Sequence, residues 1–509
     1  MTPASPATRN TAVHRDIWLL LTFLAVSTSV VLLSVFDPDG QVSRDHANYL
    51  RLAQQLLDGR GYRAPIYDAT GQAGRADVLF ATWPVGYPTA VYLVSKVSGL
   101  GVFWASKALN ILAIGLSLLA LRHRFHDAHH VGFVFLFASV ITLASYSSGD
   151  LLFSLLFLFF VLTLHDVLAH ASTARCLALA LLALSLFLLR YVGAVTVGIM
   201  GLAALLLLLQ ASRPRDALRL LTATAGSAAF MVAYLVNNLR ETGHITGIER
   251  IAAPETHAAL AAMFSQAVLV EAVPFALYPS PRNTVLGAVM SLIVVTLLVT
   301  VHRRQTAHDR GSTGLVGVLI AAAGVYAGAI LALRAISHFD NMGFRFLTPA
   351  TVLVFTALCV VFRERAADRH RLVVGASLAA VLALSFAWTT PRTVLGQWHT
   401  PHYADTVASV RTQFADLPDG SVVAFGPVHM NYLFPRLHNR RPYTVPYAAH
   451  KERWADFVDR LALDCSTPFY LNAPAHPLDP ARADASVIAW AERAHATPGG
   501  MLRITPSGC

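Results

Sequence analysis

Asp45 is the residue of this chain whose type and position point most directly to chemistry. It follows an apolar run over 17–36 and precedes an aromatic, Gly/Pro-rich segment that ends in Trp83-Pro84-Val85-Gly86-Tyr87-Pro88. A carboxylate held at a membrane surface can act as a general base and take the proton of an acceptor hydroxyl. A second interpretation makes Asp45 the N-cap of a helix over 47–57, and the two roles are compatible.

The composition is that of a polytopic membrane protein. The chain has 509 residues, of which 55% are hydrophobic and only 13% are charged. The apolar residues gather in long blocks rather than in amphipathic stripes. The net charge of +10 does not indicate nucleic-acid binding, because the basic residues form no single patch with interleaved aromatic residues.

Apolar runs long enough to cross roughly 30 Å of hydrocarbon predict about eleven spanning helices. The expected spans are 17–36, 102–121, 131–146, 151–168, 176–189, 192–209, 220–238, 284–301, 315–333, 346–362 and 372–388. The first span reads as an uncleaved anchor rather than a removed signal peptide. Residues 1–388 therefore make an all-α membrane domain.

The arginine distribution predicts the orientation, because basic residues of short loops are retained on the cytoplasmic side. Arginines fill alternate connectors, such as those with Arg122 and Arg124 or with Arg303 and Arg304. With a cytoplasmic N-terminus, the loops 37–101 and 239–283 and all residues after 388 lie on the external side.

The C-terminal residues 389–509 contain no spanning run. Alternating patches over 421–425 and 469–471 predict strands, and 405–414 and 451–463 predict helices, so we expect a small external α/β domain. An oxidising compartment would permit a disulfide between Cys465 and Cys509, while two unpaired thiols remain the alternative.

Three segments together resemble the C-type glycosyltransferase superfamily, in the branch of protein O-mannosyltransferases and lipid A aminoarabinose transferases. The first contains Asp45, Gly59-x-Gly61-Tyr62 and the Trp83–Pro88 motif. The others are Asn237-Asn238-Leu239-Arg240-x-x-Gly243-x-x-Thr246-Gly247 and Arg345-Phe346-Leu347-x-Pro349. The resemblance covers roughly residues 15 to 365.

The resemblance implies a glycosyltransferase of the bacterial cytoplasmic membrane, with Asp45 as catalytic base. Its donor would be a sugar on polyprenyl phosphate, and its acceptor a glycan, a lipid or a protein at the external face. Several relatives carry a second acid beside the first, where this chain has His46. That difference argues against a divalent metal held by an acidic pair, whereas the His and Asp residues nearby leave a divalent metal open, so the sequence predicts no particular cofactor.

Donor-phosphate contacts are expected from arginines near the external face, because a guanidinium stabilises charge growing on the leaving phosphate. Arg190 interrupts the apolar run 176–209, and the 14 apolar residues before it span only about 21 Å. It is either a functional charge or a snorkelling hairpin tip. The candidates are Arg345, which ranks first because of its motif, Arg190, Arg240 and Arg334.

The expected substrate contacts are His46, Tyr62, Trp83, Tyr87 and His338. Trp83 and Tyr87 would stack on a sugar or anchor the loop at the interface. His338 with Asp340 would orient phosphate or bind metal, or else belong to a solvated loop.

A transporter or flippase for a lipid phosphate or anion is the principal rival. Transporters usually show an internal repeat, and none is visible here. A non-catalytic scaffold for envelope assembly is the second rival. Both rivals would tolerate asparagine at position 45, whereas a general base would not.

Overall fold

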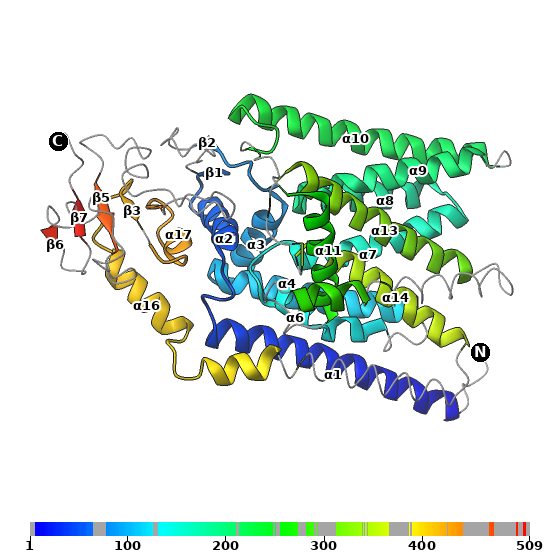
Figure 1. The fold of residues 1–509 in the computed structure, drawn as a ribbon, viewed down its shortest axis with the longest axis horizontal. Coiled ribbons are helices and arrows are strands. Elements are labelled where there is room, and N and C mark those ends of the chain that lie inside the picture. Colours follow the sequence, from blue (N-terminus) through cyan, green and yellow to red (C-terminus); the bar gives the residue numbers. More distant parts are fainter. Residues whose placement is uncertain are drawn as a thin grey trace. The chain divides into compact units, whose positions relative to one another are not determined.

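The computed structural model describes most of the chain, and Figure 1 labels its elements. The described residues are 6–64, 78–125, 131–209, 213–247, 250, 255–272, 281–289, 292, 312–337, 339, 342–343, 345–365, 386, 389–424, 426–440, 468–472, 495–496 and 502–504. The chain divides into two units. The first comprises Met1–Leu33, Lys107–Leu235 and Glu255–Trp398, and the second comprises Ser34–Ser106, Val236–Pro254 and His399–Cys509.

Six described helices are long and apolar enough to cross a membrane. They are α1 (Pro6–Phe36), α4 (Val102–Arg124), α7 (Asp150–Ala169), α9 (Val195–Leu209) with the turn η2 (Tyr191–Ala194), α10 (Pro214–Thr242) and α13 (Ser312–Ile336). Shorter apolar helices are α8 (Thr173–Leu189), α11 (His257–Ala272) and α14 (Thr348–Arg365). Large apolar side chains stay exposed along α9 and α10, as expected where lipid is the solvent. The chain is therefore a polytopic membrane protein.

Helix α7 lies at the centre of the first unit, where it packs against α8, α13 and α14. Phe153, Phe157 and Phe160 are spaced to share one face of the helix, and all three are completely buried. Tyr326 of α13 packs on this stripe, with its ring centre 5.9 Å from that of Phe153 and 5.1 Å from that of Phe157. This packing holds α7 and therefore fixes the residue at its first position, Asp150.

The continuous span expected over 131–146 is wrong. The structure breaks it into the 3-10 turn η1 (Phe133–Leu136) and the short helix α6 (Ala138–Ser145), with Phe137 extended at φ −63° and ψ 141°. The carbonyls freed at the end of α6 are satisfied from α4, because Asn110 donates to the carbonyls of Ala144 and Tyr146, both at 2.9 Å. Helix α6 can end inside the protein because these buried N–H donors replace the backbone N–H donors that a further helical turn would supply.

Two other expected spans cannot be compared in full. Of 284–301 the structure describes only the helical residues 284–289 and position 292, and of 372–388 only position 386. The remainder of both lies outside the described residues.

The second unit contains the loop between α1 and α4, with helices α2 (Arg44–Leu57) and α3 (Gly86–Ser98). The two-residue strands β1 (Arg63–Ala64) and β2 (Val78–Leu79) pair antiparallel between those helices. The loop therefore has a regular structure that can position side chains.

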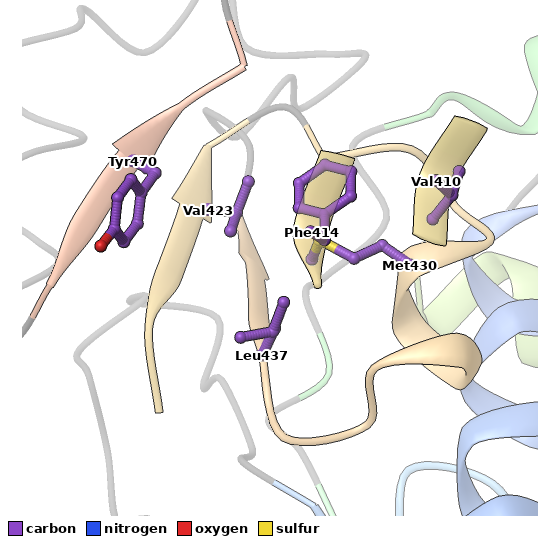
Figure 2. Close-up of a cluster of buried hydrophobic side chains, with 6 residues drawn as sticks. All are labelled: Val410, Phe414, Val423, Met430, Leu437 and Tyr470. Carbon is purple, nitrogen blue, oxygen red and sulfur yellow. The ribbon is translucent and has the colours of Figure 1, made fainter. Parts of the chain in front are cut away.

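The described C-terminal residues are mixed α/β. Helix α16 (Tyr403–Phe414) and the short α17 (Met430–Leu433) accompany a five-stranded sheet ordered β4-β3-β5-β7-β6. The strands are β3 (Val422–Ala424), β4 (His438–Arg440), β5 (Phe469–Leu471), β6 (His495–Ala496) and β7 (Leu502–Ile504). Strand β3 is parallel to β4 and β5, while β7 is antiparallel to β5 and β6. Figure 2 shows their core, to which α16 contributes Val410 and Phe414 and α17 contributes Met430.

Candidate active site

Asp45 lies in the first turn of α2, and the cap of that helix is Ser43 rather than Asp45. Ser43 Oγ accepts from the backbone N–H of His46 at 3.5 Å, and His46 Nδ1 accepts from the backbone N–H of Ser43 at 3.1 Å. This reciprocal pair is a capping box with histidine in the usual place of Glu or Gln. The N-cap interpretation of Asp45 is therefore wrong, and its half-buried carboxylate is not needed to cap the helix.

His46 itself is buried at 2% exposure, and its Nδ1 serves the cap. The structure thus assigns it a structural contact, and its expected contact with substrate stays a prediction. Because the capping box fixes the first turn of α2, it also fixes the backbone of Asp45.

Four aromatic residues form one cluster next to α2. Tyr49 of α2 lies 5.7 Å from Trp83 and 5.4 Å from Tyr87 between ring centres, and Trp83 stacks on Phe80 at 5.4 Å. Tyr87 is completely buried, whereas Trp83 is half-buried. A sugar could reach Tyr87 only if its neighbours moved, so of the two expected sugar contacts Trp83 is the more accessible.

Tyr62 is half-buried and hydrogen-bonds through its hydroxyl to Thr89 Oγ1. Burial raises the pKa of the Tyr62 phenol, so the group stays protonated at neutral pH and can donate or accept a hydrogen bond. Its predicted contact with substrate is a hydrogen bond of this kind.

The motif after α10 supports the loop that carries Trp83. Asn238 Nδ2 donates to the carbonyl of Ile245 at 3.2 Å, which closes the turn. Gly247 has φ +76°, and a Cβ at this position would collide with the backbone of Ala81 and Thr82. Only glycine permits this close approach, so packing explains the glycine at position 247 of the motif. The sequence alone does not reveal this reason.

Arg190 and Arg345 converge on one carboxylate in the first unit, that of Asp150. Arg190 pairs with Asp150 Oδ1 and donates to the carbonyl of Arg345 at 3.0 Å, and Arg345 Nε donates to Asp150 Oδ2 at 3.0 Å. The side chains of Asp150, Arg190 and Arg345 are 3%, 12% and 16% exposed. Sequence reasoning selected both arginines but missed Asp150, whose only signal is a carboxylate that begins an apolar helix.

The surroundings of Asp150 restrict the geometry of both guanidinium groups. Ser148 Oγ donates to Asp150 Oδ2 at 2.8 Å, which orients the carboxylate. The ring of Phe346 lies 4.8 Å from the Arg190 guanidinium carbon and 5.9 Å from that of Arg345. Both cations thus face the same aromatic ring, a contact worth about 1–2 kcal/mol in partly desolvated sites.

Lys107 of α4 is a second residue that sequence reasoning missed. It is 1% exposed, binds the carbonyl of Ser145 and donates to Ser147 Oγ at 2.9 Å. Its N–H donors thus satisfy oxygen atoms at the C-terminal end of α6. Its signal in the sequence is a lysine inside an apolar run, which is rare unless the charge has partners.

The other arginine candidates are arranged differently. Arg334 is completely buried and pairs with both carboxylate oxygens of Glu255, with its guanidinium carbon 5.5 Å from the ring centre of Phe339. Arg240 is exposed in the last turn of α10. Their donor-phosphate roles stay predictions.

Several expected contacts cannot be located. His338, Asp340, Cys465 and Cys509 lie outside the described residues. Among the residues that the structure does describe, no group of three His, Cys, Asp or Glu side chains is arranged to hold a metal ion.

The comparisons with known proteins give likeness in structure without likeness in sequence. No protein-family model matches the chain, and no curated protein matches it. The structure is similar to that of ArnT from Cupriavidus metallidurans in the apo state, with a TM-score of 0.53 at 14% identity over 98% of each chain. The same protein bound to undecaprenyl phosphate gives 0.52 at 13% identity, over 96% of this chain and 98% of that one.

A third solved structure is that of the archaeal oligosaccharyltransferase AglB from Archaeoglobus fulgidus, in complex with an inhibitory peptide and a dolichol-phosphate. Its TM-score is 0.50 at 11% identity, and the match covers 97% of this chain and 74% of that one. At such identities the likeness concerns the fold. The chain has a fold similar to those of ArnT and AglB.

Proposed function

We propose that this protein is an inverting glycosyltransferase that moves a sugar from a polyprenyl-phosphate donor to an acceptor at the external face of the bacterial cytoplasmic membrane. The observation that carries the proposal is the pair of guanidinium groups, Arg190 and Arg345, converging on buried Asp150. The fold adds support, because the ArnT structure in the comparison is bound to undecaprenyl phosphate and the AglB structure to a dolichol-phosphate.

A phosphate is the anion that this pair fits best. A guanidinium carries five N–H donors in a planar fork whose geometry matches a phosphate as well as a carboxylate. Phosphate accepts such donors bidentately, and in a weakly hydrated site these contacts are stronger than in water. Before the donor binds, Asp150 holds both guanidinium groups in place, and this preorganises them for the charge that grows on the leaving phosphate.

Asp45 would supply the base. Its carboxylate takes the proton of the acceptor hydroxyl while the acceptor oxygen attacks C1 of the sugar. The bond from C1 to the phosphate oxygen breaks, and its electron pair leaves with the polyprenyl phosphate. An ionised carboxylate in the first turn of α2 also interacts favourably with the helix dipole. The transition state resembles that of glycoside hydrolysis.

The proposed external placement has support in the second unit. The loop between α1 and α4 belongs to the same unit as the described C-terminal residues. Segments that lie on the same side of a membrane can pack together in this way. Arg122 and Arg124 lie at the far end of α4 from that loop, as expected for a cytoplasmic end.

Donor-lipid binding tests the phosphate site. The purified protein in nanodiscs would be heated with undecaprenyl phosphate, with undecaprenol or with phosphatidic acid, which separates the roles of the phosphate and of the polyprenyl chain. At 100 times its dissociation constant the lipid should stabilise the native protein by about 2.7 kcal/mol. Arg345→Gln and Arg190→Gln should lose most of this gain.

Arg124→Gln is the matched control, because Arg124 also pairs with an aspartate of α7, Asp166, at the opposite end of the helix. It should keep the native gain. Equal stabilisation of all variants by undecaprenyl phosphate would show that Arg190 and Arg345 do not bind the donor.

A further inference from the structure

The C-terminal residues contact both ends of the loop that carries Asp45. Phe36, where α1 ends, packs edge-on against His402 with ring centres 4.6 Å apart. Phe103, at the start of α4, stacks on Tyr403 at 4.0 Å with the rings 12° from parallel. All four residues belong to the second unit. The loop is therefore bound to the N-terminal end of α16 at the points where it leaves and re-enters the spanning helices.

A buried histidine makes a third contact with the same loop. His429 is completely buried, and both of its ring nitrogens have partners: Nε2 lies 2.9 Å from Asp39 Oδ1 and Nδ1 lies 2.6 Å from the hydroxyl of Tyr432. A neutral imidazole satisfies both contacts, because its Nε2–H can donate to the carboxylate while Nδ1 accepts from the phenol. The bond to His429 lowers the pKa of Asp39, which keeps that carboxylate ionised at neutral pH.

His429 lies at the N-terminal end of α17, which is firmly packed. Its neighbour Met430 belongs to the hydrophobic cluster drawn in Figure 2, where it packs with Phe414 of α16 and Leu437. The backbone on which His429 lies is thus fixed by the core of the C-terminal residues. A hydrogen bond from such an element can hold a loop in one position.

The same C-terminal segment also contacts α2 directly. Arg51, which is 5% exposed, donates through Nη2 to the carbonyl of Pro435 at 2.5 Å. Asp39 and Arg51 lie on either side of Asp45 in the chain, so the two contacts bracket the first turn of α2. A carboxylate that must meet an acceptor hydroxyl within hydrogen-bonding distance depends on this kind of support.

We propose that His429 is a positioning residue: through Asp39 it holds the loop between α1 and α4 on the C-terminal residues, and thereby holds Asp45 in place for proton transfer. The role in transfer rests on the proposed function, whereas the restraint on the loop does not. This gives the C-terminal residues a task in the reaction.

Two substitutions of His429 separate its two contacts. The amide nitrogen of glutamine can occupy the place of Nε2, so His429→Gln can still donate to Asp39. Asparagine reaches only the place of Nδ1, so His429→Asn keeps a polar group near Tyr432 and loses Asp39. His257→Asn serves as control, because His257 is an exposed histidine of the other unit.

The readouts are hydrogen exchange over residues 37–57, kcat and donor KM per folded molecule, and the melting temperature. His429→Asn should speed exchange in this segment and lower kcat on the order of 10- to 100-fold with donor KM unchanged. His429→Gln should restore slow exchange and most of kcat. A merely stabilising histidine would instead lower the melting temperature and leave kcat per folded molecule unchanged.

The outcomes also separate this inference from the proposed function. If the native protein transfers sugar and His429→Asn keeps native kcat, His429 does not position the base. If exchange over 37–57 is the same in all variants, the restraint on the loop is absent, whatever the activity. If no donor supports transfer by the native protein but exchange responds as expected, the restraint stands and the proposed function fails.

Discussion

Replacing Asp150 with alanine removes the carboxylate that two largely but not fully buried arginines share. Asp150 also accepts from Ser148, and it is only 3% exposed, so little water can take its place. Breaking a buried ion pair by deleting one partner costs about 3–5 kcal/mol, because a buried charge is left uncompensated. We therefore expect Asp150→Ala to lower the free energy of unfolding by about 3–5 kcal/mol, and Asp150→Asn by less, because its amide oxygen still accepts one hydrogen bond.

Helix α7 supplies a control of the same chemistry at its other end. Asp166 binds both terminal nitrogens of Arg124, but these side chains are 29% and 36% exposed. Pairs so exposed contribute only about 0–1 kcal/mol, because water and salt screen them. Asp166→Ala should therefore cost several-fold less than Asp150→Ala.

Unfolding in mixed detergent micelles measures both changes. A thiol-reactive dye can report it, since Cys176 and Cys359 are buried in the native protein. Polyprenyl phosphate should recover part of the loss in Asp150→Ala, because its phosphate supplies the anion that the arginines have lost. Equal costs for the two aspartates, or a cost for Asp150→Ala below about 1 kcal/mol, would refute the assignment of a buried, preorganised pair.

Three further changes test the supports of the site. Ser43→Ala removes the cap of α2 and should lower the free energy of unfolding by about 1 kcal/mol, which thermal melting measures. It should also slow sugar transfer. An unchanged transfer rate would show that the cap does not hold Asp45. Gly247→Ala should destabilise well beyond Gly243→Ala, because both have positive φ but only Gly247 lies against the backbone of Ala81; equal melting temperatures would contradict this packing. The pKa of Asp39 is lowered in the folded protein. The stabilising contribution of Asp39 is therefore complete above its ordinary pKa of about 3.9 and is lost as the pH falls through the lower pKa of the folded protein. Melting curves recorded at acid pH should show this loss in the native protein and not in Asp39→Asn.

The sequence predicts the class of fold because long apolar runs leave few alternatives. Helices α1, α4, α7, α9 and α13 lie where those runs lie. The run 131–146 misled the prediction, because hydropathy records apolar side chains and not the buried donors of α4 that let a helix end early. Asn110 lies 34 residues before the carbonyl of Ala144 that it binds, so no local pattern contains the contact.

The sequence predicted which residue types belong to the candidate site, but not which residues pair with one another there. Arg190 and Arg345 attract attention as charges at the ends of apolar runs, but their common partner lies 40 and 195 residues away in sequence. A single acid at the start of an apolar helix more often signifies an exposed first turn, which is why Asp150 was missed. At α2 the error was local: Ser43 and Asp45 are both good caps, and His46 completes the box for Ser43 in place of the usual Glu.

The most direct test is transfer of labelled sugar from a panel of polyprenyl-phosphate donors in membranes that contain the native protein, Asp45→Asn or Asp58→Asn at equal amounts. Asp58 is the matched control, because it is an exposed aspartate at the opposite end of the same helix. The proposal predicts transfer by the native protein and by Asp58→Asn, and none above background by Asp45→Asn. Transfer by Asp45→Asn at the native rate would contradict the assignment of Asp45 as the base.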